Sequence, residues 1–166
     1  MNYRTLRLKR GKEESLDRFH PWVFSGALAE PLPEGLEEGD NVSVTASDGR
    51  CIGVGHFQIG SIAVRILDFG DTAIDTAFYT RRLEQALALR RALGLARPDN
   101  DAYRLVHGEG DFLPGLVVDI YGPTAVLQAH SPGMHYARGL IADAIVRLPG
   151  LGVRNVYYKS ETTLPY

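Results

Sequence analysis

The N-terminal part of the chain alternates between apolar and polar positions with the two-residue period of β-strands. Residues 4–10 place Leu6 and Leu8 on one face of such a strand. Arg7 and Lys9 lie on the opposite face, which predicts a half-buried strand with a basic outer side. The alternation returns in three further segments, 42–44, 52–56 and 62–66. Several short strands within about 65 residues predict a small β-barrel.

A short helix is predicted to interrupt this alternation over residues 12–19. We expect it to end at His20, because Pro21 follows and the residue before a proline avoids helical backbone angles. Trp22 and Phe24 come directly after the proline, at alternating positions. Sequence spacing alone leaves open whether these two rings face the core or a bound partner.

The second half of the chain combines helical spacing with short strands. Asp75 is placed to cap a helix that runs through residues 78–93. Ser131 is expected to cap a second helix, with Pro132 at its first position. The apolar face predicted for this second helix consists of Met134, Leu140, Ile141, Ile145 and Leu148. Strands are predicted at 103–106, 116–121, 125–128 and 153–159.

Together these elements indicate an α+β protein made of two small domains. Residues 1–70 form the predicted barrel. Residues 71–166 form an α+β domain with the order helix, three-strand run, helix and strand. Domains of about 60 residues can fold on their own, so each half is long enough to bury a core.

Composition narrows the class of protein without identifying it. Of the 166 residues, 45% are hydrophobic and 23% are charged, which is typical of a folded protein and not of a disordered chain. The single cysteine, Cys51, excludes a disulfide framework, so we expect a reducing, cytoplasmic compartment. No apolar run reaches about 18 residues, and we therefore expect no membrane partner.

Charge is distributed unevenly along a chain whose net charge is −2. The first twelve residues hold five basic and no acidic residues, whereas residues 30–48 hold acidic residues and no basic ones. Basic residues interleave with aromatic ones, which favours RNA binding, because phosphates attract cations and unstacked bases pack on flat rings. The RNA-binding residues predicted from this pattern are Lys9, Arg10, Lys12, Arg18, His20, Trp22, Arg50 and Arg65.

Two weaker patterns suggest enzymatic chemistry. Ser131 lies between a strand and a helix, as some serine nucleophiles do, but Pro132 lacks the N–H that an oxyanion hole would need. His107, Glu109 and Asp111 alternate, as metal ligands or an acid–base pair would. The glycines between them favour a tight turn with carboxylates bonded to nearby N–H groups. A small hydrolase that uses Ser131 or the Glu109/Asp111 pair is therefore an alternative function.

Two Gly-x-Gly segments, 53–55 and 108–110, begin like the fingerprint of a dinucleotide or S-adenosylmethionine loop. Neither has the third glycine or opens a clear helix, which the phosphate-binding mechanism requires. We interpret these glycines as strand and turn residues, and we predict neither a cofactor site nor a metal site in this chain.

Two long motifs resemble a known family. The first motif consists of KRGKEESL at residues 9–16 and HPWVFSGA at residues 20–27, and the second is YRLVxGEGDxLPGLVVD at residues 103–119. They resemble bacterial 23S rRNA methyltransferases that carry an N-terminal PUA domain and methylate the 5-position of cytosine. The resemblance implies a PUA-type RNA-binding barrel followed by a central α+β domain. In that family a Rossmann-like domain then binds S-adenosylmethionine and supplies a cysteine nucleophile.

The resemblance also implies what this chain lacks. The chain ends at Tyr166, before the methyl-donor loop and any catalytic cysteine motif, and Cys51 matches no catalytic position. We therefore expect the catalytic Rossmann-like domain to be absent and this chain alone to be inactive and to bind no S-adenosylmethionine. Its expected role is to target the enzyme to ribosomal RNA, while homodimer formation stays open. A free-standing RNA-binding or ribosome-assembly module without catalysis is the main alternative.

Overall fold

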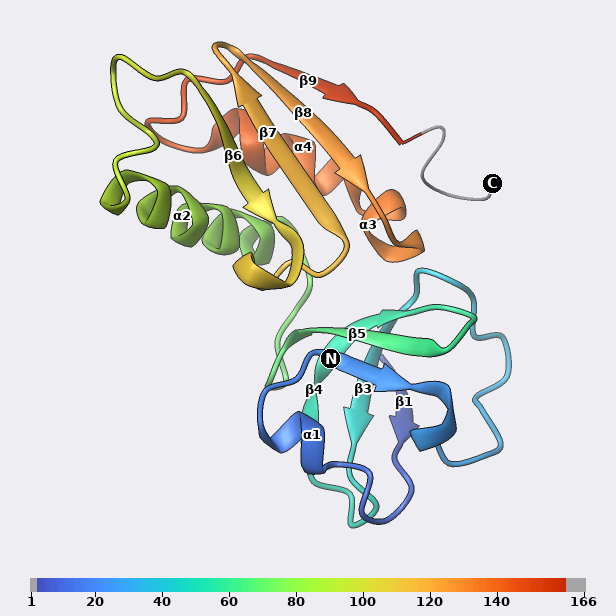
Figure 1. Ribbon diagram of the computed structural model, residues 1–166. Helices are drawn as coiled ribbons and strands as arrows, with labels where there is room; N and C mark the ends of the chain where they lie inside the picture. Colours follow the sequence, from blue (N-terminus) through green and yellow to red (C-terminus); the bar gives the residue numbers. More distant parts are fainter. Residues whose placement is uncertain (1–2, 161–166) are drawn as a thin grey trace. The chain divides into compact units, whose positions relative to one another are not determined.

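The structure, a computed structural model, describes residues 3–160 (Figure 1). Its contacts divide the chain into two compact units, Met1–Ala73 and Ile74–Tyr166. Each unit has its own sheet, with five strands in the first and four in the second. No helix in the described part of the chain is long and apolar enough to cross a membrane.

The first unit is built on five short strands and one turn of helix. The strands are β1 (Arg4–Arg7), β2 (Trp22–Phe24), β3 (Asn41–Thr45), β4 (Cys51–Phe57) and β5 (Ile62–Asp68). The helix α1 spans Glu14–Asp17, and a 3-10 turn, η1, spans Ser25–Ala27. The strand order is β1-β3-β4-β5-β2, in which β1 runs parallel to β3 and the other pairs are antiparallel.

Backbone hydrogen bonds join the two ends of this sheet. The Lys9 N–H donates to the Ala27 carbonyl at 2.8 Å, and the Ala29 N–H donates to the Arg7 carbonyl at 2.8 Å. An isolated antiparallel bridge lies between these two bonds. The segment that follows β2 therefore closes the sheet onto β1, in agreement with the predicted small barrel.

Alternate strand residues fill the interior of this unit. The core includes Leu6, Leu8, Val42, Val44, Ile52, Phe57, Val64 and Ile66. Gly53 and Gly55 lie where β4 comes against the backbone of β5, and a Cβ atom added at Gly55 would overlap the Arg65 carbonyl oxygen. The prediction that these glycines are strand residues is confirmed. They are needed here because the backbones of the two strands pack closely.

The helix of this unit is shorter than predicted. It covers Glu14–Asp17 instead of residues 12–19. Arg18 already departs from helical geometry, and Phe19 has a left-handed backbone with φ 61°, so the chain turns before it reaches the proline. The strand predicted over residues 4–10 also ends early, where the barrel closes.

The second unit contains a four-stranded sheet and three helices. The strands, in their order in the sheet, are β6 (Ala102–His107), β7 (Leu116–Tyr121), β8 (Thr124–Ala129) and β9 (Asn155–Tyr158). The helices are α2 (Thr76–Ala92), α3 (Pro132–Tyr136) and α4 (Arg138–Arg147), and a 3-10 turn, η2 (Gly108–Asp111), follows β6. β6, β7 and β8 pair antiparallel, whereas β9 returns parallel to β8 after the two short helices.

The two faces of this second sheet differ in burial. On one face, β7 and β8 present Leu116, Val118, Ile120, Ala125, Leu127 and Ala129, all at most 2% exposed. The alternating residues of the same strands are half-buried or exposed. Figure 1 shows α4 behind the strands, and the helices supply the buried residues that complete this core. The opposite face of the sheet is left open.

The second predicted helix is divided in two. Ala137 ends α3 and precedes α4. Leu140 is 41% exposed, so its predicted place on the apolar face was wrong. The other residues predicted for this face are buried: Met134, Ile141, Ile145 and Leu148. The predicted cap is confirmed, since the Met134 N–H donates to the Ser131 hydroxyl oxygen at 3.4 Å and Pro132 opens the helix.

Candidate nucleic-acid interface

The eight predicted RNA-binding residues all lie in the first unit, in three groups. The aromatic group consists of His20, Trp22 and Arg65, together with Phe24. The basic loop consists of Lys9, Arg10 and Lys12, between β1 and α1. The remaining two residues, Arg18 and Arg50, lie beside acidic side chains of α1.

Three rings of the aromatic group contact one another on the outside of the barrel. The ring centroids of His20 and Trp22 are 5.5 Å apart, and those of Trp22 and Phe24 are 6.5 Å apart, both edge to face. Val23, between the two β2 rings, belongs to the core, so its neighbours face outward. In the described structure neither Trp22 nor Phe24 belongs to the core cluster, and Phe24 is 50% exposed. The rings therefore form a surface group.

An arginine on β5 extends the aromatic group. Arg65 is the register partner of Trp22, and its guanidinium carbon lies 5.7 Å from the centroid of the indole ring. The Arg65 Nε donates to the Gln58 side-chain oxygen at 3.1 Å, which orients the guanidinium beside the ring. Gln58 also lines a hollow of about 290 Å³ whose walls include Leu28 and Phe57. An arginine stacked near exposed rings offers a nucleic acid both charge and a flat surface.

The basic loop is held against the segment that follows the aromatic group. The Lys9 ammonium donates to the Gly26 carbonyl at 3.0 Å, two residues after Phe24. All three cations of the loop are exposed. Within residues 3–160, the side chains of Arg10 and Lys12 make no hydrogen bond or ion pair, so both charges are available to an anion.

Arg18 and Arg50 differ from the basic loop because each has an acidic partner. Arg50 lies 3.1 Å from Asp17, and Arg18 lies 3.7 Å from Glu14. The hydrogen bond and charge of Asp17 hold the pKa of Arg50 above its ordinary value. These pairs add no net positive charge to the surface. The structure thus links the basic loop to the aromatic group and leaves Arg18 and Arg50 in local ion pairs.

Sequence reasoning missed two residues next to this surface. Gln58 orients Arg65 by accepting its hydrogen bond. The two residues are seven positions apart, and they meet only because β4 pairs with β5. His56 is the register partner of Arg65 on β4 and is 4% exposed. Burial lowers the pKa of His56 to about 4, so its imidazole is neutral at pH 7 and adds no charge.

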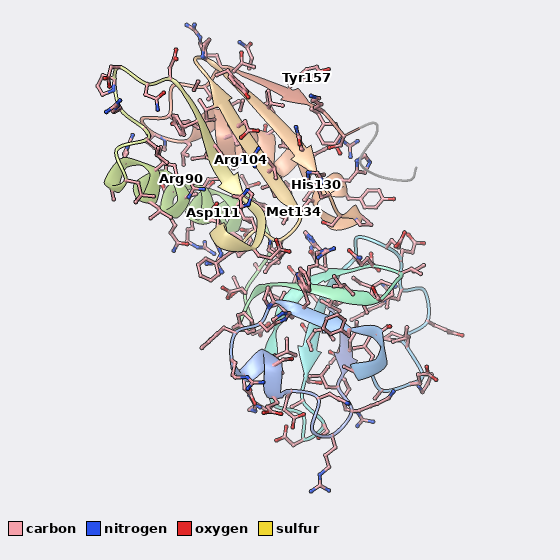
Figure 2. All side chains as sticks on the ribbon, in the orientation of Figure 1. Arg90, Arg104, Asp111, His130, Met134 and Tyr157 are labelled. Carbon is pink, nitrogen blue, oxygen red and sulfur yellow. The ribbon has the colours of Figure 1, made fainter. Side chains whose placement is uncertain are left out.

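The residues that suggested enzymatic chemistry have structural partners instead. The carboxylate of Asp111 is buried and accepts two hydrogen bonds from Arg90 and one from the His107 N–H, all at 2.6 Å (Figure 2). Ser131 is 2% exposed, and its hydroxyl caps α3. Within the described residues, no group of three or more His, Cys, Asp or Glu side chains is arranged to hold a metal ion. A buried ion pair accounts for Asp111 and a buried helix cap accounts for Ser131.

The barrel corresponds to a known domain family. Residues 6–69 match the family model described as a PUA-like domain. The first unit contains a PUA-like domain. The basic loop and the aromatic group both lie on this PUA-like domain.

Over most of its length the chain is similar to two named bacterial proteins. Ribosomal RNA large subunit methyltransferase I of Salmonella arizonae is 40% identical over 147 residues, which are 87% of this chain and 36% of that protein. The protein of the same name from Escherichia coli O1:K1 is 41% identical over 144 residues, 85% of this chain and 36% of its own. The chain therefore spans a little over a third of the length of these relatives.

Two solved structures are similar in fold to most of this chain. A protein from Streptococcus mutans named as a SAM-dependent methyltransferase gives a TM-score of 0.77 at 15% identity, over 94% of this chain and 40% of that chain. A crystal structure of SMU.776, named as a methyltransferase and complexed with SAH, gives the same values. At this level of identity the similarity concerns the fold alone.

Proposed function

We propose that this chain is the RNA-targeting part of an S-adenosylmethionine-dependent methyltransferase that modifies the 5-position of a cytosine in 23S rRNA. One observation carries the proposal: a PUA-like domain bears two exposed, unengaged cations in a loop that Lys9 ties to the segment after a surface aromatic group. The names of the relatives support ribosomal RNA as the substrate of the whole protein and methyl transfer as its reaction. The single cysteine supports a cytoplasmic location.

The two surface groups would divide the work of binding. Arg10 and Lys12 would attract RNA phosphates and release the counterions that surround them. Trp22 and Phe24 would stack on unpaired bases, with the Arg65 guanidinium beside the indole ring. Phosphate contacts supply affinity and stacked bases restrict binding to single-stranded segments, as targeting an enzyme to one region of rRNA requires.

The methyl donor would be held by the remainder of the parent protein. Neither Gly-x-Gly segment of the described residues fits a cofactor loop, because Gly53 and Gly55 lie inside β4 and residues 108–110 lie in η2. Calorimetry with S-adenosylmethionine tests this assignment. We expect no heat of binding from this chain, and tight binding would overturn it.

A double variant tests the basic loop. We expect Arg10→Ala/Lys12→Ala to lower the affinity for an rRNA fragment about tenfold at low salt and to reduce the slope of log K against log salt by roughly two. Fluorescence anisotropy titrations at several salt concentrations measure both quantities. Neither side chain makes a hydrogen bond or ion pair in the described structure, and both are exposed, so folding should be unaffected.

A matched control removes the same charge elsewhere. Arg81 and Arg147 are exposed residues of the second unit. Arg81→Ala/Arg147→Ala should leave both the affinity and the salt slope close to those of the unmodified chain. Equal slopes for the two double variants would contradict the proposed role of the basic loop.

A further inference from the structure

One face of the second sheet is not covered by the helices of its own unit. We define the open face by six of its residues, which lie on all four strands: Arg104, His107, Asp119, Tyr121, Gln128 and Tyr157. Figure 2 labels Arg104 and Tyr157 on this sheet. The buried face of β7 and β8 is entirely apolar, whereas the open face mixes rings, charges and an amide.

The strand register arranges these side chains in rows. One row crosses all four strands and contains Arg104, Asp119, Val126 and Tyr157. The next row on this face includes Tyr121. Tyr121 is 57% exposed and Tyr157 is 61% exposed. The rings of Tyr121 on β7 and Tyr157 on β9 thus flank strand β8 on the open face.

A bulge in β6 brings two further groups to the open face. The register of β6 against β7 shifts between Arg104 and Val106, which places Arg104 and His107 on the same side. The Arg104 guanidinium is 3.1 Å from the His107 Nδ1 and donates to both oxygens of Asp119, at 2.7 and 3.0 Å. Because Asp119 balances the charge of Arg104, the open face carries rings and hydrogen-bonding groups with little net charge.

We propose that the open face is a second RNA-binding surface, which stacks unpaired bases on Tyr121 and Tyr157. His107 and Gln128 lie on the same face and would bond the edges of those bases. This inference rests on the proposed function, since it assigns part of the same RNA to the second unit. The mechanism of binding differs from that of the basic loop, because RNA would be held at the open face by stacking of bases and not by attraction of phosphates.

Composition favours RNA over a protein partner at this face. A protein interface has an apolar, charge-depleted centre, whereas the central row of the open face contains the Arg104–Asp119 ion pair. Exposed aromatic residues on the open side of a four-stranded sheet form a known kind of stacking surface for single-stranded RNA. Each stacked base contributes about 1–3 kcal/mol by alanine substitution and tolerates any sequence.

The test measures binding of the chain to a labelled single-stranded oligouridine and to the same strand in a duplex. We expect stronger binding to the single strand. Tyr121→Ala and Tyr157→Ala should each lower the affinity for the single strand about tenfold, with an unchanged salt slope. Tyr121→Phe and Tyr157→Phe keep the flat ring and should retain the affinity, which separates stacking from folding defects.

Tyr136 provides the matched control. It is 62% exposed but lies on α3, outside the open face. Tyr136→Ala should leave the affinity unchanged. Ultraviolet crosslinking followed by mass spectrometry should attach uridine to the peptides that contain Tyr121 or Tyr157.

The outcomes separate this inference from the proposed function. If Tyr121→Ala/Tyr157→Ala binds as well as the unmodified chain while Arg10→Ala/Lys12→Ala does not, the open face is not an RNA surface and the role of the basic loop stands. If only the tyrosine variants bind more weakly, the proposed role of the basic loop is wrong and the proposed role of the open face is supported. Loss of affinity in the phenylalanine variants as well would overturn stacking as the mechanism.

Discussion

The two sheets of this chain place their exposed residues in different ways. In the first unit the sheet closes on itself through the backbone of Lys9 and Ala29, so its inner face is all core. Exposed side chains are then confined to loops and to the outer positions of strands such as β2. In the second unit the sheet stays open, and one whole face remains available. The same alternation of apolar and polar residues therefore yields a localised patch in one unit and a continuous surface in the other.

The two units also bury polar groups differently. The first unit buries the neutral imidazole of His56. The second buries an ion pair, in which Arg90 and Asp111 are 8% and 7% exposed. A buried charge loses its solvation, so it destabilises the fold strongly once its partner is removed. Variants of these groups should therefore affect the units by different amounts and under different conditions.

The largest effect is expected from Asp111→Asn. It leaves the Arg90 guanidinium buried without a countercharge and should lower the free energy of unfolding by about 3–5 kcal/mol. Denaturant titration measures the loss, and hydrogen exchange should localise it to the second unit. A loss below about 1 kcal/mol would show that the pair contributes little.

The next effect is a pH dependence in the first unit. The pKa of His56 is about 4 in the folded chain and 6.5 when it is exposed, so between these values the unfolded state binds more protons. Stability should therefore be complete above pH 6.5 and fall by about 3 kcal/mol as the pH decreases to 4.

A His56→Gln variant isolates this contribution from the carboxylates, which also titrate near pH 4. The variant should have a shallower decline in the free energy of unfolding between pH 6.5 and 4. Identical declines in the variant and the unmodified chain would mean that the imidazole is not held neutral by burial.

A smaller effect is expected where β4 packs on β5. Gly55→Ala adds a methyl group that overlaps the Arg65 carbonyl oxygen, and the backbone must shift, at a cost of about 2–3 kcal/mol. Gly26→Ala is the control, because a Cβ atom there would have no neighbour within 4 Å. Thermal unfolding of the two variants should differ clearly, and similar transition temperatures would contradict the close packing.

The smallest effect is expected from Asp119→Asn, the same chemical change as Asp111→Asn at an accessible ion pair. The Arg104 side chain is 46% exposed, so solvent can replace the lost partner and the cost should stay below about 1 kcal/mol. Denaturant titration of both variants compares the two pairs directly. A cost equal to that of Asp111→Asn would remove the distinction between them.

Local sequence patterns predicted many of the helices and strands. They did not predict how these elements are joined to one another in the fold. Alternation located every strand of the two sheets except β2, and Ser131 marked a helix start, because side-chain period and capping are local properties. Barrel closure depends on backbone bonds between residues 7–9 and 27–29, which leave no trace in side-chain spacing. Leu140 is exposed because it lies about 100° around α4 from Ile141 and so points away from the buried face of the helix.

The sequence predicted which types of residue form the candidate interface. It did not predict how these residues are arranged in space. The alternation of residues 20, 22 and 24 with basic neighbours indicated the aromatic group. The acid that pairs with Arg50 could not be assigned, since Asp17 and Arg50 are far apart in the chain. Asp111 suggested acid–base chemistry by its spacing, yet its role is set by Arg90, which lies 21 positions earlier.

The parallel pairing of β1 with β3 has a consequence for folding during synthesis. Arg4 pairs with Val42, so β1 emerges from the ribosome well before its partner exists. At about 5–20 residues per second, this interval lasts roughly 2–8 s, during which the apolar side chains of β1 have no completed core. β6, β7 and β8 instead pair with their immediate neighbours through short turns and can assemble as they appear. β1 therefore waits longer for its first strand partner than β6, β7 or β8 do.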